Sequence, residues 1–128
     1  MTIKDFAAVR TLGLRLPGVV EATAYGAPAL KLGGKIVACV PTNKSAEPNS
    51  LMVKIDPEQR AELLRQQPRV YYVTDHYEPH PTVLVRLASI SQADLKELLH
   101  DACRYVAGPA SRAKRPTTSR RRKPASKR

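Results

Sequence analysis

The sequence predicts an α+β domain, built on a compact antiparallel sheet of about five to six strands with about two to three helices. Short apolar or β-branched runs separated by glycine and proline turns indicate hairpins. Helical periodicity is confined to a few segments, which do not alternate with the strands as a doubly wound parallel sheet requires. The 128 residues have the length of a single domain.

The first half of the chain predicts one helix and three strands. The helix is expected over residues 3–15, where Phe6 and Val9 begin an apolar helical repeat that ends before Pro17. Thr2 and Asp5 have the spacing of a capping box in front of it. The strands are expected over residues 20–25, 29–32 and 35–40, and they are separated by Gly26, Pro28 and the pair Gly33-Gly34.

The second half repeats the pattern after a turn-rich loop over residues 41–50. A strand over 51–55 precedes a helix over 57–67, which Asp56 caps and Pro57 begins. Strands over 70–74 and 82–87 are joined by the loop DHYEPHP. Ser91 caps a last helix, whose apolar face runs through Leu95, Leu98, Leu99, Ala102 and Val106 toward Gly108.

The glycine pair Gly33-Gly34, followed by Lys35, raises the question of a phosphate-binding loop. Such a loop ends in Gly-Lys-Ser/Thr and leads into a helix. Here the glycines lead into KIVACV, which is typical of a strand, and no hydroxyl follows the lysine. Two residues that tolerate positive φ between strands indicate a tight hairpin turn, with Lys31 and Lys35 on either side of its tip.

Charge is distributed unevenly along the chain. Lys and Arg total 22 against 11 Asp and Glu, a formal net charge of +11. Residues 109–128 hold nine of the cations and no acid, which leaves residues 1–108 with a net charge of +2. This segment has few apolar residues and repels itself, so we expect a disordered basic tail. Its cations are Arg112, Lys114, Arg115, Arg120, Arg121, Arg122, Lys123, Lys127 and Arg128.

Two functions fit such a tail. Lysine and arginine bind nucleic-acid phosphates whatever the base sequence, because they release condensed counterions. A basic segment can also act only as a solubilising extension. We favour the first interpretation, an electrostatic arm for nucleic acid.

Catalysis, metal binding and cofactor binding have no positive signal in the sequence. The histidines and acids of DHYEPH are zinc-ligand types, but its prolines oppose the helix that brings such histidines to one face. We therefore expect a non-enzymatic protein with no metal and no cofactor. Cys39 and Cys103 lie in apolar stretches, which indicates small core residues in a reduced, cytoplasmic setting. No run resembles a signal peptide or a membrane span, and we expect a monomer.

Several sequence blocks occur in a characteristic order. LPGVxE is followed by YGxPxxK and GGK over residues 16–35, and then by SLMVKIDPEQRAELLRQQPRVYYVTDHY, VLVRL and DLKELLHDACRYVA. Together these blocks resemble the MmcQ/YjbR family over about residues 5–107. The resemblance implies that residues 1–108 form a compact domain similar to the frataxin-like CyaY fold, in a cytoplasmic bacterial protein whose hairpins form a double-wing DNA-binding motif. It does not imply iron chemistry, because the first helix offers only Asp5 as a carboxylate.

The leading hypothesis is therefore a DNA-binding module with no strong sequence preference. Gly33 and Gly34 shape the wing, and phosphate contacts come from the basic tail and from Lys31, Lys35, Lys54, Arg69 and Arg86. The alternative is a small-molecule- or protein-binding domain that uses the sheet face or the His76 loop, with the tail as a solubility or non-specific nucleic-acid element. The net charge of only +2 on residues 1–108 favours this alternative. RNA in place of DNA stays open.

Overall fold

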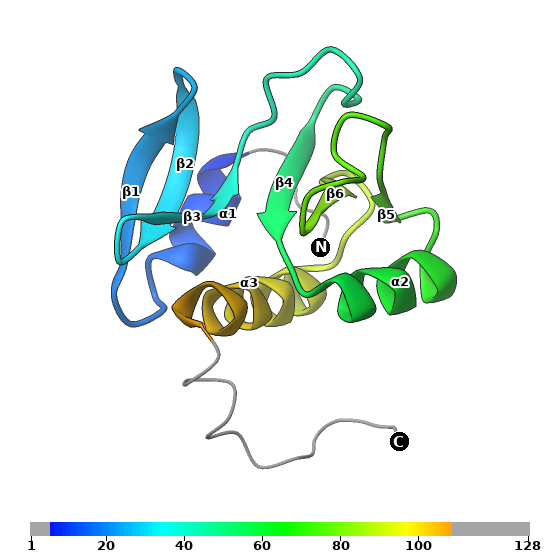
Figure 1. Cartoon of the computed structure of the whole chain (residues 1–128). Helices are drawn as coiled ribbons and strands as arrows, with labels where there is room; N and C mark the ends of the chain where they lie inside the picture. Colours follow the sequence, from blue (N-terminus) through cyan, green and yellow to red (C-terminus); the bar gives the residue numbers. More distant parts are fainter. Residues whose placement is uncertain (1–5, 109–128) are drawn as a thin grey trace.

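The computed structural model describes residues 6–108, which form a six-stranded antiparallel sheet and three helices (Figure 1). This confirms the predicted α+β class. The strand order is β1-β2-β3-β4-β6-β5. In chain order the elements are α1 (Phe6–Gly13), β1 (Val19–Ala24), β2 (Ala27–Leu32), β3 (Lys35–Cys39), β4 (Ser50–Lys54), α2 (Pro57–Gln66), β5 (Tyr71–Tyr72), β6 (Thr82–Arg86) and α3 (Gln92–Ala107).

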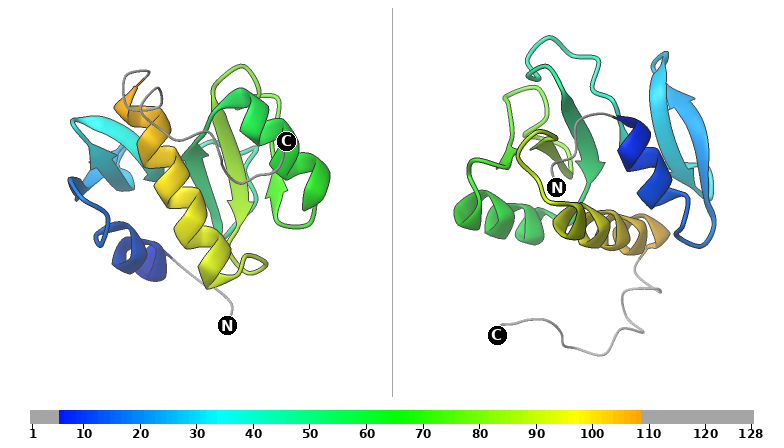
Figure 2. Two further views of the ribbon diagram at one scale, coloured as in Figure 1. Left: turned by 90° about the horizontal axis from the view of Figure 1, so that it is seen from below. Right: turned by 180° about the vertical axis from the view of Figure 1, so that it is seen from behind.

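All three helices cover one face of the sheet (Figure 2). α3 crosses β2, β3 and β4, α1 packs against α3 and β2, and α2 packs against β5 and β6. The main hydrophobic core lies between these layers. Its fully buried side chains include Leu30, Leu51, Val83, Leu95 and Leu99. None of the helices within residues 6–108 has the length and apolar character needed to cross a bilayer.

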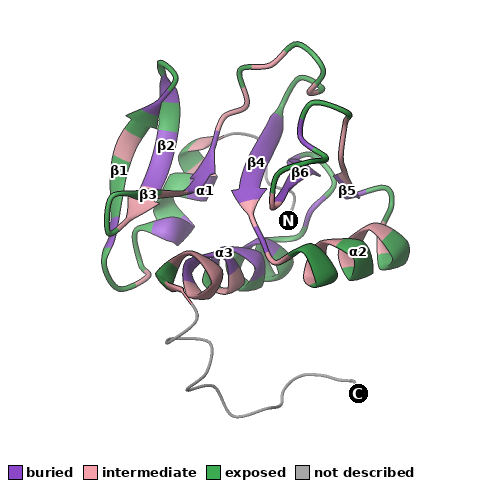
Figure 3. Ribbon diagram, viewed as in Figure 1, coloured by how far each residue is buried: buried purple, intermediate pink, exposed green. Residues whose placement is uncertain are grey.

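The other face of the sheet, which we call the open face, carries no helix among residues 6–108 (Figures 1 and 3). A smaller apolar cluster lies on it, and the loops over residues 40–49 and 73–81 contribute side chains to its cover. Its buried members are Ala24, Ala29, Cys39, Met52, Tyr77 and Leu84. The predicted core positions of Cys39 and Cys103 are confirmed, since both thiols are free and buried.

Local sequence signals account for most element boundaries. The carboxylate of Asp56 accepts hydrogen bonds from the N–H groups of Glu58 and Gln59, and the hydroxyl of Ser91 accepts one from the N–H of Asp94. These caps begin α2 and α3 as predicted. The capping box at Thr2 and the basic tail over 109–128 lie outside the described residues.

The predicted Gly33-Gly34 hairpin turn is confirmed between β2 and β3. Leu32 pairs with Lys35, and the two glycines have φ of 59° and 81°. Both therefore adopt the left-handed conformation that a two-residue type I′ turn requires. A Cβ placed on either glycine would meet no atom within 4 Å, so the turn projects into open space.

The strand predictions at residues 70–74 and at Pro28 needed correction. The strand expected over 70–74 is reduced to Tyr71–Tyr72, because the chain turns at Thr74, whose carbonyl accepts the N–H groups of Tyr77 and Glu78. Pro28, expected to interrupt a strand, lies inside β2. Its carbonyl accepts the N–H of Val40 at 2.9 Å, just beyond the last residue of β3, so the strand continues through it.

Close packing between α1 and the sheet depends on Gly13. A Cβ on Gly13 would lie 2.3 Å from Cδ1 of Leu30, a side chain that is 0% exposed. Leu30 is enclosed by the main core and has little room to move. The helix can approach β2 at this point because residue 13 has no side chain.

We expect Gly13→Ala to lower the free energy of unfolding by about 1–3 kcal/mol, the usual range for overpacking a core. Alanine has a higher helix propensity than glycine, so propensity alone predicts that Gly13→Ala stabilises the protein. We expect the overpacking against Leu30 to outweigh this gain. Urea unfolding measures the effect. Leu30→Val in the same background should recover part of the loss. A Gly13→Ala variant as stable as the parent would contradict the tight contact.

Candidate functional site

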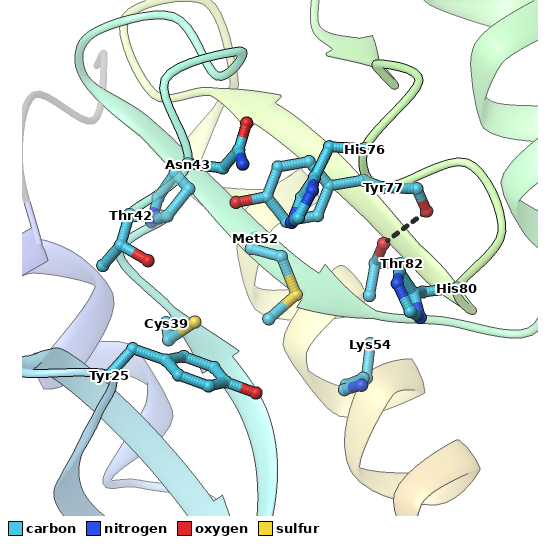
Figure 4. A pocket seen from close by; sticks show the side chains of 11 residues that line it. Tyr25, Cys39, Thr42, Asn43, Met52, Lys54, His76, Tyr77, His80 and Thr82 are labelled. Carbon is cyan, nitrogen blue, oxygen red and sulfur yellow. Dashed lines mark hydrogen bonds between the residues drawn. The ribbon is translucent and has the colours of Figure 1, made fainter.

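The open face contains a cavity of about 480 Å³ (Figure 4). β3, β4 and β6 contribute Cys39, Met52, Lys54 and Thr82 to it. The β1–β2 turn and the loops over 40–49 and 73–81 contribute the remaining lining residues. These are Tyr25, Pro41, Thr42, Asn43, His76, Tyr77 and His80.

The wall formed by residues 73–81 is held in place by its own contacts. Tyr77 is 8% exposed, and its backbone carbonyl accepts a hydrogen bond from the hydroxyl of Thr82 at 3.3 Å (Figure 4). Burial raises the pKa of the Tyr77 phenol above its usual value. The ring of His76 meets that of Tyr77 edge-on at 4.7 Å. The ring of His80 lies 6.4 Å from that of His76.

Lys54 is the one lysine or arginine that residues 6–108 contribute to the cavity lining. It ends β4 opposite Thr82, and it takes part in none of the four ion pairs found among residues 6–108. No Asp or Glu of the described residues lines the cavity. The cavity wall therefore favours a negatively charged group near Lys54.

Cys39 is a structural thiol rather than a nucleophile. Burial raises its pKa, and the nearby charge of Lys54 offsets only part of this shift. A thiol reacts through its deprotonated form, so a raised pKa leaves it unreactive at neutral pH. Cys39 and Met52 thus give the cavity an apolar floor.

The loop over residues 40–49 is tied to the rest of the open face through Arg86. The guanidinium of Arg86 donates two hydrogen bonds of 2.9 Å to the carboxylate of Glu47 and lies 4.4 Å from the centre of the Tyr72 ring. The Tyr72 hydroxyl also accepts the N–H of Glu47 at 2.7 Å. These contacts position one rim of the cavity.

The five phosphate-contacting residues predicted within residues 1–108 lie at two opposite ends of the sheet. β3 begins at Lys35 and β4 ends at Lys54, so in an antiparallel pair these residues share one end with Lys31. Arg86 pairs with Ser50 at the far end of β4, and Arg69 lies beside it. One surface does not join all five.

Arg86 differs from the other predicted contacts because its side chain is already engaged. Besides Glu47, it donates to the carbonyls of Pro68 and Arg69 at 3.1 and 3.3 Å. Lys31, Lys35, Lys54 and Arg69 enter none of the four ion pairs of residues 6–108. The nine predicted tail residues lie outside the described range.

The His76 loop brings no metal-ligand cluster together. Within residues 6–108, no group of three or more His, Cys, Asp or Glu side chains has the arrangement to hold a metal ion. The expectation of a protein without a metal stays a prediction.

The family model YjbR matches residues 14–104, most of the described chain. The chain belongs to the YjbR family. The crystal structure of Deinococcus radiodurans protein DR2400, with a domain of the DUF419 family model, is similar to this YjbR chain, with a TM-score of 0.66 and 23% identity over 88% of both chains. That likeness shows the shared fold.

Curated relatives match a shorter part of this YjbR protein. Uncharacterized proteins of Mycobacterium tuberculosis and Mycobacterium bovis are 48% identical to it over 40 residues. The matched segment is 31% of this chain and 31% of each relative.

Tyr25 is a cavity residue that the sequence did not single out, as are Asn43 and Met52. It was assigned to the end of a strand, but it forms the β1–β2 turn with Gly26, at φ of 55° and 78°. The available signal was the Tyr-Gly pair between two strands. Tyrosine at this position is unusual, because the left-handed conformation favours glycine, asparagine and aspartate.

The pairing of Glu47 with Arg86 predicts a pH-dependent contribution to stability. The hydrogen bond from Arg86 lowers the pKa of Glu47 below its usual 4.5. A lowered pKa in the folded state contributes stability above the unfolded-state pKa, and this contribution is lost as the pH falls through the folded-state pKa. Because both side chains are partly exposed, the effect should be small.

We therefore expect Glu47→Gln to melt slightly below the parent at pH 7, with the difference shrinking as the pH falls below about 4.5. Thermal melts across pH 3–7 measure this. Glu97→Gln is the matched control, because Glu97 is exposed on α3 and in none of the four ion pairs. A difference that persists unchanged to pH 3 would contradict the ionic contribution.

Proposed function

We propose that this YjbR-family chain is a non-enzymatic DNA-binding module in which the β2–β3 hairpin and the basic residues 109–128 contact the phosphate backbone. One observation carries the proposal. Lys31 and Lys35 flank a hairpin tip that projects into open space, and neither lysine belongs to an ion pair among residues 6–108.

The two lysines lie on opposite faces of the hairpin. Lys31 pairs with Ile36, which packs on the open face, whereas Lys35 pairs with Leu32, which packs toward the helices. Cross-strand partners share a face, so each lysine extends to its own side of the tip. A two-stranded ribbon fits the major groove of DNA, and cations on both sides of it can reach the phosphates that border the groove.

The two glycines make this tip narrow. Gly33 and Gly34 are exposed and bear no side chains, so the hairpin ends in bare backbone. Lys54 lies at the same end of the sheet, but it lines the open-face cavity, so we do not assign it to DNA. We do not assign Arg86 to DNA, because its guanidinium already binds Glu47 and two backbone carbonyls.

The basic residues 109–128 supply the larger electrostatic term in this proposal. They carry nine cations and no acid, whereas residues 1–108 have a net charge of +2. Affinity from such a segment is independent of base sequence and falls steeply with salt. The hairpin then sets the orientation on the duplex, because phosphate contacts position a protein without reading bases.

The composition of the cavity supports the non-enzymatic part of the proposal. Its lining within residues 6–108 holds two histidines but no carboxylates to pair with them or with each other in acid–base catalysis. Its thiol, Cys39, has a raised pKa. The reactions that depend on an activated cysteine or on paired carboxylates therefore lack their groups in this cavity.

Replacing both hairpin lysines, as Lys31→Gln with Lys35→Gln, should weaken binding to duplex DNA of any sequence by a similar factor. Two lost phosphate contacts should also make the slope of log affinity against log salt less negative by about 1.8. Fluorescence anisotropy with labelled duplexes over a salt series measures both effects. Melting temperature should stay near that of the parent, since exposed charges contribute little to folding.

The matched control is Lys44→Gln with Lys96→Gln, which removes the same charge from positions away from the hairpin tip. If both double variants weaken binding equally, only net charge matters and the hairpin is not the contact. Gly33→Val with Gly34→Val gives the complementary test. It should destabilise the fold, because β-branched residues resist positive φ.

Removing residues 109–128 should make the salt dependence much weaker. If about half of the nine cations contact phosphate, the slope should become less negative by about 4. The truncated chain retains every described strand and helix, so its melting temperature provides the folding control. An unchanged salt slope after truncation would show that the segment does not bind DNA.

A further inference from the structure

We infer that the open-face cavity binds a small aromatic anion, a molecule that joins a flat ring to a phosphate or carboxylate group. This site is separate from the hairpin tip and does not depend on DNA binding. Three features support the inference: the geometry of the cavity, the charge of its lining and the positive backbone φ of one exposed tyrosine.

The cavity has the size and composition of a ligand site. Its volume of about 480 Å³ lies within the range usual for small-molecule pockets. Such sites combine apolar walls with a few polar groups that orient the ligand. Here Cys39 and Met52 give the apolar floor, while Lys54, Asn43 and two histidines give the polar groups.

Lys54 defines where the anionic group binds. Its side chain extends into the cavity beside His80 (Figure 4). The two acids in the loop over 73–81, Asp75 and Glu78, do not line the cavity, and Glu78 lies 3.9 Å from Arg60. A phosphate or carboxylate here would be the partner that Lys54 lacks among residues 6–108.

Tyr25 defines where the ring binds. It is 81% exposed, and its ring stands at the edge of the cavity with the hydroxyl directed toward the side of Lys54 (Figure 4). Its φ of 55° costs on the order of 1–2 kcal/mol for a residue with a side chain. Because the ring is so exposed, it gains little packing energy to offset this cost. Backbone strain that packing does not offset indicates a functional role.

Asn43, His76 and His80 supply further polar groups to the cavity lining. Oδ1 of Asn43 accepts the N–H of Ser45 at 2.9 Å, which leaves its NH₂ group as the part that can donate to a ligand. The imidazoles of His76 and His80 are exposed and can donate N–H to an anion or contact a ring. A ring between Tyr25 and Met52 would place its anionic group at Lys54, with His80 beside it (Figure 4).

Binding can be tested on the ¹⁵N-labelled full chain by NMR, with phenyl phosphate as the probe and about 0.15 M salt to screen the exposed cations. We expect saturable amide shifts at Tyr25, Asn43, Lys54 and Tyr77. Inorganic phosphate and phenol, which are the two halves of the probe, should each bind at least about tenfold more weakly. Benzoate in a parallel titration distinguishes a carboxylate from a phosphate site, and saturable binding of either supports the inference.

Three variants sharpen the test. Lys54→Gln should weaken binding about tenfold or more, because it removes a charge-assisted hydrogen bond. Tyr25→Asn should weaken it about threefold or more, and asparagine tolerates the positive φ, so the turn is retained. Lys96→Gln removes the same charge from an exposed site on α3 and should bind as the parent does.

The inference is overturned if neither phenyl phosphate nor benzoate gives saturable shifts at the cavity. It is also overturned if folded Lys54→Gln and Tyr25→Asn variants both bind within twofold of the parent. Inorganic phosphate binding as tightly as phenyl phosphate would show that the ring contributes nothing to affinity. That result would also overturn the inference, which requires an aromatic ligand. The spectrum of each variant shows directly whether its fold is retained.

Discussion

Burial of β4 and β6 on both faces is the constraint on which the rest of the structure depends. The first four residues of each strand are buried, so neither face of this central pair can be left to water. The helices cover one face with a continuous apolar core. The other face is covered by the loops over 40–49 and 73–81. Where these loops pack on the sheet, their backbone N–H and C=O groups lose water and need hydrogen-bond partners. The bonds between Glu47, Tyr72 and Arg86 meet that need.

The cavity is a consequence of this unequal cover. Loops cannot close over a sheet as densely as helices do, because their backbone groups must stay near water or near a specific partner. Tyr77 is buried in the apolar cluster of the open face, and the cavity beside it lies between the two loops and Tyr25. The same twisted sheet carries the β2–β3 hairpin away from this cover. The proposed DNA contacts and the proposed ligand site therefore occupy different parts of one scaffold.

Arg86 and Lys54 show how far charge alone can indicate a role. Each ends a strand with an apolar run before it, so their sequence contexts are nearly alike. The structure places Arg86 against Glu47, which is 39 residues away, and places Lys54 in the cavity without an acid. One cation stabilises a loop, and the other is available for a ligand.

The sequence by itself determined the elements and most of their limits, because their causes are local. Asp56 and Ser91 cap helices through neighbouring N–H groups, and Gly33-Gly34 supplies the positive φ of a hairpin turn. The ordered blocks over residues 16–35 also indicated the family. Only the tertiary structure decided the strand order, the partner of Arg86 and the cavity, whose lining comes from segments between residues 25 and 82. Such contacts join residues far apart in the chain, and no pattern among sequence neighbours records which distant side chain will meet them.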